Sequence, residues 1–141
     1  MARVSTYINT VGRTEEALRF YAEVFRSNVS SVTRFSDVGM TDIPEHERDG
    51  LMHGEVEIMA GHVLMGTDMI ASAGHRIALG NNMSVNLEPD TRDEADRIYA
   101  MLSVDSTENS GGLVDMDWGA YWGTCVDRFG IRWMINVADR P

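Results

Sequence analysis

The sequence has little of several features that would narrow its function at once. Its 141 residues include a single cysteine, Cys125, which excludes an intramolecular disulfide and any cysteine-based zinc site. No segment approaches the ~20 consecutive apolar residues of a membrane span, and the first residues, MARVSTYINTVG, lack the apolar core of a signal peptide. We therefore expect a cytoplasmic protein.

Positive charge is also scarce. Twelve Lys and Arg residues stand against 22 Asp and Glu residues, for a formal net charge of −10. Nucleic acids and anionic membranes bind basic patches, so we expect neither as a partner. The hydrophobic content of 43% is ordinary for a globular protein, and the length is enough for one sizeable core.

What the chain does have is a stretch rich in aromatic rings near its C-terminus. Residues 118–136, WGAYWGTCVDRFGIRWMIN, contain all three tryptophans: Trp118, Trp122 and Trp133. The pattern predicts strands over 120–126 and 131–137, joined by a turn with Asp127 and Gly130. So many large rings are either buried or line a binding site.

The remaining elements follow from periodicity. A helix is predicted from Thr14, as N-cap before Glu15 and Glu16, to about residue 26. A second helix is predicted over 91–102, where TRDE forms a capping box. Strands are predicted over 4–9, 29–35, 52–59, 62–67, 83–87 and 113–118. Loops are predicted over 37–50 and 103–112, with a connector over about 69–82.

That order of elements indicates an internal duplication. EEALRFY at 15–21 and DEADRIY at 93–99 share four of seven residues at an offset of 78. GHVLM at 61–65 matches GIRWM at 130–134 at an offset of 69. Both matches fall at equivalent places in the element order. The chain therefore reads as two βαβββ modules, over about 1–68 and 83–141.

These motifs resemble the vicinal oxygen chelate superfamily, which includes glyoxalases, bleomycin-resistance proteins and extradiol dioxygenases. The hairpin motif DRFGIRWMIN and the VLMGTD ending of the first module are most similar to the PhnB-like branch, often labelled 3-demethylubiquinone methyltransferase-like. The resemblance covers nearly the whole chain. It implies an α+β fold of one domain, in which two tandem modules form a curved mixed sheet, or cup, with helices outside.

The resemblance also implies where a metal would be held. Metal-dependent members take one ligand from the first and fourth strand of each module, which places Thr6, Met65, Ser84 and Met134 at those positions. Hydroxyl and thioether groups are poor ligands for hard divalent ions. We therefore expect no metal site in the usual place, and no cofactor.

A metal-free cup would bind a small organic molecule, as the resistance proteins of the superfamily do. The candidate lining residues are Thr6, Ile8, Val63, Met65, Ser84, Asn86, Trp122 and Met134. The amides of Asn9, Asn86 and Asn136 either orient a polar ligand or satisfy backbone groups at strand ends. The resemblance further implies a homodimer.

The alternative is a metal-dependent lyase, isomerase or dioxygenase that uses other ligands. His53, Glu55 and Glu57 alternate on one predicted strand, at the spacing of a facial triad. Regular pairing across the Ala60–Gly61 turn would set Glu57 opposite Leu64 and turn the three polar groups away from Met65. An exposed polar face is then the favoured interpretation.

Three further candidates carry less weight. His46, in the acidic loop, could act as a general base if that loop closes over the cup. Cys125 has no basic neighbour in the sequence, which favours a buried, inert thiol over a nucleophile. A methyltransferase finds no support, because no glycine-rich nucleotide loop follows a strand.

Overall fold

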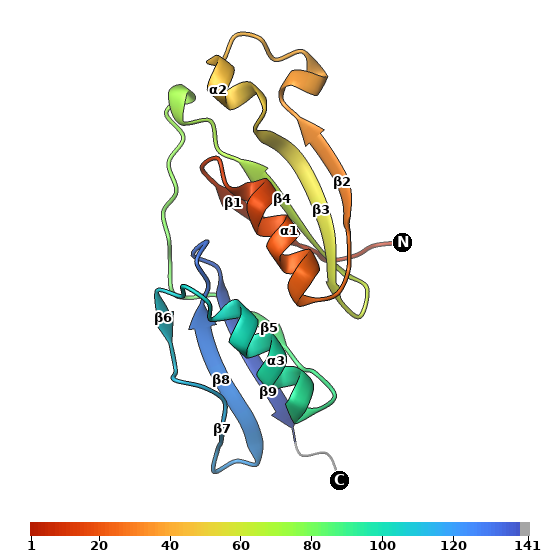
Figure 1. The fold of residues 1–141 in the computed structure, drawn as a ribbon, viewed down its shortest axis with the longest axis vertical. Helices are drawn as coiled ribbons and strands as arrows, with labels where there is room; N and C mark the ends of the chain where they lie inside the picture. Colours follow the sequence, from red (N-terminus) through yellow and green to blue (C-terminus); the bar gives the residue numbers. More distant parts are fainter. Residues whose placement is uncertain (139–141) are drawn as a thin grey trace. The chain divides into compact units, whose positions relative to one another are not determined.

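A computed structural model describes residues 1–138, and the chain divides into two compact units, residues 1–78 and residues 79 onward. Each unit is a mixed sheet with one long helix against it (Figure 1). The division falls within the expected connector. The predicted α+β fold with two tandem modules is confirmed.

The first unit contains the βαβββ order predicted for it. Its main elements are β1 (Thr6–Thr10), α1 (Thr14–Val24), β2 (Val29–Arg34), β3 (Leu51–Met59) and β4 (His62–Asp68). The strand order is β1-β4-β3-β2, with β1 parallel to β4 and the other neighbours antiparallel. Short helical turns occupy the loops: η1 (Ser36–Val38), α2 (Glu45–Arg48) and η2 (Ala71–Ala73).

The second unit repeats this arrangement with one change. It contains β5 (Val85–Leu87), α3 (Arg92–Leu102), β6 (Glu108–Asn109), β7 (Val114–Asp115), β8 (Ala120–Val126) and β9 (Arg132–Ala138). The strand order is β5-β9-β8-β6, and β7 also pairs with β8. Two strands of two residues thus stand where β2 stands in the first unit. The predicted strand over 113–118 is confirmed only at 114–115, and β6 lies in a segment expected to be a loop.

Helix α1 lies very close to its sheet because two facing strand residues lack side chains. A Cβ on Gly66 would lie 2.6 Å from the Thr14 methyl carbon, and one on Gly54 would lie 2.6 Å from a Leu18 methyl carbon. Leu18, Val56 and Leu64 are fully buried in this layer. The contact identifies the face of the sheet that packs on α1, and therefore also the opposite face.

The first turn of α1 is held by a residue from the end of β4. The Asp68 carboxylate accepts hydrogen bonds from the backbone N–H of Thr14 at 3.0 Å, the backbone N–H of Leu51 at 2.8 Å and the Thr10 hydroxyl at 3.2 Å. Thr14 is the first helical residue and Arg13 is the N-cap, so the prediction of Thr14 as N-cap is wrong. Arg13 makes no side-chain cap hydrogen bond, so the remote Asp68 carboxylate serves as the cap, while the Thr14 hydroxyl donates to the Thr67 carbonyl.

The β8–β9 hairpin has an equivalent organising carboxylate. Asp127 is fully buried, and its carboxylate accepts from the Trp133 indole N–H at 2.8 Å. It also accepts from the backbone N–H groups of Phe129 at 2.8 Å and Ile131 at 3.1 Å. The predicted Asp–Gly turn is confirmed, and its aspartate also fixes the orientation of the largest buried ring.

Within residues 1–138, no helix has the length and apolar character needed to cross a membrane.

Candidate functional site

The candidate site of the first unit lies on the face of its sheet away from α1. In the β1–β4 pair, Tyr7 is opposite Met65, whereas Ile8 is opposite Gly66. Gly66 faces α1, so Ile8 does too, and successive strand residues alternate between faces. Tyr7 and Met65 therefore share the other side. We call this the helix-free face of the first unit; it consists of Tyr7, His53, Glu55, Glu57, Val63 and Met65.

An irregularity in the β3–β4 hairpin determines which β3 side chains reach this face. Met59 pairs with His62 across the turn, but Glu57 pairs with Val63, so the strand gains one residue at Ile58. Such a bulge shifts every later pair by one. Glu55 is consequently opposite Met65. The predicted register, with Glu57 opposite Leu64, is wrong, and the polar side chains of β3 lie on the same face as Met65.

Three of these side chains form a continuous hydrogen-bonded chain. The Tyr7 hydroxyl lies 3.3 Å from His53 Nδ1, and His53 Nε2 lies 3.1 Å from a Glu55 carboxylate oxygen. Since a carboxylate only accepts, Nε2 carries the hydrogen, and in the neutral imidazole Nδ1 then accepts from the Tyr7 hydroxyl. The Tyr7 and His53 rings are also in contact, with centroids 5.8 Å apart.

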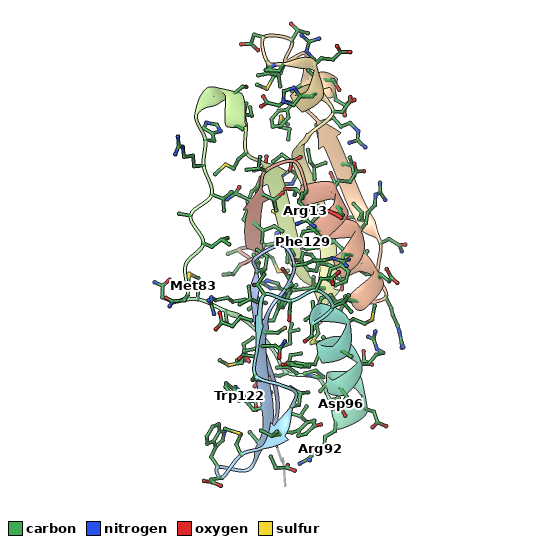
Figure 2. The ribbon with its side chains drawn as sticks, turned by 60° about the vertical axis from the view of Figure 1, so that its left-hand side comes forward. Arg13, Met83, Arg92, Asp96, Trp122 and Phe129 are labelled. Carbon is green, nitrogen blue, oxygen red and sulfur yellow. The ribbon has the colours of Figure 1, made fainter. Side chains whose placement is uncertain are left out.

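The second unit has an equivalent face, formed by β5, β8 and β9. Asn86 is opposite Met134, and Trp122 is opposite Asn136. The neighbouring Tyr121 donates its hydroxyl to Asp96 of α3, at 2.6 Å, so Trp122 lies on the side away from the helix, as Figure 2 shows. We call this the helix-free face of the second unit; it consists of Asn86, Trp122, Thr124, Met134 and Asn136.

This second face combines rings, a thioether and one unsatisfied acceptor. The Trp118 and Trp122 rings meet edge to face, with centroids 6.4 Å apart. Among residues 1–138, the Asn136 side-chain oxygen is buried and has no hydrogen-bond partner. A buried acceptor without a donor is costly, by about 1–3 kcal/mol. A ligand with an N–H or O–H group would remove that cost.

The residues predicted from sequence to line a cup are distributed over both units, and not all of them lie on a helix-free face. Val63 and Met65 lie on the helix-free face of the first unit, and Asn86, Trp122 and Met134 on that of the second. Ile8 belongs instead to the core beneath α1, with 5% exposure. The placement of Thr6 on the ligand side is likewise corrected, because it pairs with Leu64 and its hydroxyl lies 2.9 Å from His62 Nε2. Ser84 is exposed and precedes β5.

The same register corrects the positions equivalent to the family's metal ligands. The strand partners of Met65 and Met134 are Tyr7 and Asn86, not Thr6 and Ser84. A phenol, an amide and two thioethers make a poor set for a divalent ion. Within the described part of the chain, no group of three or more His, Cys, Asp or Glu side chains is arranged to hold a metal ion. The side chain of His46, the candidate general base of the acidic loop, is 79% exposed, and its Nε2 lies 3.8 Å from a Glu47 carboxylate oxygen.

Cys125 lies in β8 on the side facing the core and is 3% exposed. Burial raises the pKa of its thiol to about 11. The thiolate, which is the reactive form, is therefore rare at neutral pH. This agrees with the expectation of an inert thiol.

Sequence reasoning missed Tyr7 as a site residue and misread the role of His53 and Glu55. The alternation of His53, Glu55 and Glu57 was visible, but the choice of face depended on the register. The apolar residues Val56 and Ile58 indicate which side of this strand faces the core. The amphipathic helix buries its apolar side, which includes Leu18, so the apolar side of the strand packs against it. That argument would have placed the polar residues on the helix-free face without any knowledge of the bulge.

Comparisons with known proteins agree with this architecture. The sequence profile of the family described as 3-demethylubiquinone-9 3-methyltransferase matches residues 3–136. Protein PA1353 from Pseudomonas aeruginosa superposes with a TM-score of 0.82 at 23% identity, over 98% of each chain. The PhnB protein from Bacillus cereus gives 0.80 at 21% identity, over 97% of this chain and 100% of that one.

More distant structures share the fold alone. The bleomycin resistance determinant encoded on transposon Tn5 has a TM-score of 0.57 at 13% identity, over 99% of this chain and 100% of that one. A search of curated proteins gave no match. The profile match extends from β1 to within β9, and so includes both helix-free faces. The chain therefore belongs to the 3-demethylubiquinone-9 3-methyltransferase family, the PhnB-like branch of the glyoxalase and bleomycin-resistance fold.

Proposed function

We propose that this protein binds a small, partly aromatic organic molecule without a metal, and that the helix-free face of the second unit supplies the main contacts. The observation that carries the proposal is the buried side-chain oxygen of Asn136, which has no partner among residues 1–138. It lies opposite Trp122 in the β8–β9 ladder. An aromatic ring and a hydrogen-bond acceptor side by side fit a flat ligand with a polar hydrogen.

Several features support a ligand role for this face over a purely structural one. Asn136 is on the side away from α3, where Met134 adds a polarizable thioether that adapts to the shape of a ring. The Tn5 protein that shares this fold is a bleomycin resistance determinant.

The test separates binding from folding by replacing Asn136 with leucine. Asn136→Leu removes the orphan oxygen with a side chain of similar size, so the free protein keeps or gains stability. Thermal-shift titration with hydroxy-aromatic compounds and aromatic cations then compares the wild type with this variant. A ligand that binds only the folded state raises the melting temperature of the wild type, and the shift is lost in the variant.

Two further variants show whether a lost shift is specific to the proposed binding face. Asn81→Leu makes the same chemical change at an exposed position and leaves the ligand-dependent shift intact. Trp122→Ala removes the proposed stacking ring and reduces the shift. If Asn136→Leu instead destabilised the free protein and left the ligand shift unchanged, Asn136 would be a structural residue and the proposal would be refuted.

The proposal includes two further properties: the protein holds no metal, and it forms a homodimer. Metal analysis of protein purified without a nickel column finds no stoichiometric ion in this interpretation. One equivalent of a divalent ion that survives dialysis, and is lost in His53→Ala, would favour the metal-dependent lyase, isomerase or dioxygenase. The family resemblance supports a homodimer, and light scattering at micromolar concentration tests it.

A further inference from the structure

Tyr7, His53 and Glu55 of the first unit are linked by hydrogen bonds that the fold of the unit does not require. Tyr7 is on β1, whereas His53 and Glu55 are on β3, and β4 lies between the two strands. The side chains therefore reach across a whole strand to meet. Tyr7 is 49% exposed, so this contact contributes little to a buried core.

The two hydrogen bonds that link Tyr7, His53 and Glu55 have the same donor-to-acceptor direction, from Tyr7 to Glu55. The Glu55 carboxylate accepts from His53 Nε2–H, at 3.1 Å, so in the neutral imidazole Nδ1 is unprotonated and turned toward the Tyr7 hydroxyl. Tyr7 donates its only hydrogen to Nδ1, at 3.3 Å. Its oxygen keeps acceptor capacity for a group that approaches from outside the sheet.

We propose that Tyr7, His53 and Glu55 form a proton relay that makes the Tyr7 oxygen a general base for an acidic hydroxyl group, of the phenol or enol class. The hydroxyl proton of the bound molecule passes to the Tyr7 oxygen as the Tyr7 proton passes to His53 Nδ1. The ligand becomes an anion and the imidazole becomes a cation, which the Glu55 carboxylate stabilises. Reversal returns the proton, so the step needs no oxidant, reductant or cofactor.

The surroundings of the relay favour this ligand class. Met65 lies opposite Glu55, and Val63 lies opposite Glu57, so apolar groups border the relay on β4. A thioether next to the phenol ring suits an aromatic or unsaturated carbon skeleton. Glu57 is the remaining charged residue of the helix-free face. The neighbouring strand residues on the same side of the sheet are uncharged: Ser31, Thr33, Asn9 and Thr67.

All three relay residues belong to the first unit, and the relay can be tested without the natural ligand. The probe is p-nitrophenyl acetate, whose acetyl carbonyl the activated Tyr7 oxygen attacks. The new bond joins the Tyr7 oxygen to the acetyl carbon, and the bond from that carbon to nitrophenolate breaks. The Tyr7 proton goes to His53 and then to solvent. Peptide mass spectrometry locates the acetyl group, and absorbance follows nitrophenolate release.

The expected result is rapid acetylation of Tyr7 that depends on the relay. His53→Gln and Glu55→Gln slow it, His53→Gln by roughly 100-fold, the lower range for a general base. Glu57→Gln is the matched control: it makes the same change as Glu55→Gln on the same strand and face, and stays within about twofold of wild type.

Exposure alone would give a different outcome. Equal labelling of Tyr7 in wild type and both relay variants, or no preferential labelling of Tyr7 in wild type, overturns the relay. Nitrogen NMR of wild-type His53 provides a second measurement that does not depend on a variant folding. Protonation at Nε2 supports the relay, and protonation at Nδ1 refutes it. Neither result bears on ligand binding at Asn136.

Discussion

Replacement of Asp127 by asparagine tests how the β8–β9 hairpin is held together. Asparagine keeps one carbonyl oxygen, which still accepts from the backbone N–H groups of Phe129 and Ile131. Its amide group cannot accept from the Trp133 indole N–H, now bonded at 2.8 Å to a carboxylate oxygen. Both partners are fully buried, so the loss leaves an unpaired donor. We expect a loss of about 1–3 kcal/mol in the free energy of unfolding.

The assay is urea unfolding followed by circular dichroism, because tryptophan fluorescence changes when Trp133 is altered. A double-mutant cycle with Trp133→Phe isolates the indole–carboxylate bond from the cavity that the smaller ring creates. In the Trp133→Phe background no indole donor remains, so the additional cost of Asp127→Asn falls by about 1 kcal/mol or more. Asp117→Asn, at an exposed position in the same unit, serves as the control for removal of a charge.

One result would refute this reasoning. If Asp127→Asn cost the same with and without the indole, the coupling between the two side chains would be zero. The stability of the hairpin would then rest on the backbone bonds of the turn alone. Asp127→Ala, which removes all three accepted bonds, sets the upper limit of the series and is expected to cost more than Asp127→Asn.

The other predictions concern the first unit and the thiol. Hydrogen bonds from Arg34, and then from Arg19, lower the pKa of Glu15 from its ordinary 4.5 to about 2, so their contribution to stability is full above about pH 4.5 and is lost as pH falls through about 2. Glu15→Gln is expected to cost under ~1 kcal/mol at pH 7, and this cost shrinks steadily as the pH is lowered toward 2, by urea midpoints. Gly66→Ala forces a methyl group against Thr14, 2.6 Å away, and is expected to cost about 1–3 kcal/mol by the same assay. Cys125 stays unreactive toward an aromatic disulfide reagent at pH 8 until denaturant is added; fast labelling of the native protein would contradict its burial.

The sequence was informative wherever a local pattern determined the structure. The helix at 92–102 begins after Thr91, whose hydroxyl accepts from the Glu94 backbone N–H at 3.2 Å, as the capping box indicated. The turn at Ala60–Gly61 has two residues with positive φ, as a tight hairpin requires. In both places the residues that specify the conformation are adjacent in the chain.

The candidate site was predicted less well, because it depends on pairing between distant segments. Thr6 was assigned to the ligand side by counting back from the helix, but the pairing of β1 with β4 sets Tyr7 there. The repeat offset of 78 holds for the helices, whereas Tyr7 and Asn86, the strand positions paired with Met65 and Met134, are 79 apart. One extra residue between strand and helix is enough to exchange the two faces of a strand.

The extra residue at Ile58 has a consequence for how such a protein changes over evolutionary time. Deleting it would remove the bulge but leave Glu57 opposite Val63 and Glu55 opposite Met65, so His53 and Glu55 would stay on the helix-free face. The bulge therefore tolerates the loss of one codon at this position, whereas a one-residue insertion or deletion in β3 that no bulge absorbs would exchange the two faces of the strand. Relatives that differ in hairpin length should be compared by strand pairing, because aligned letters at these positions can belong to opposite sides of the sheet.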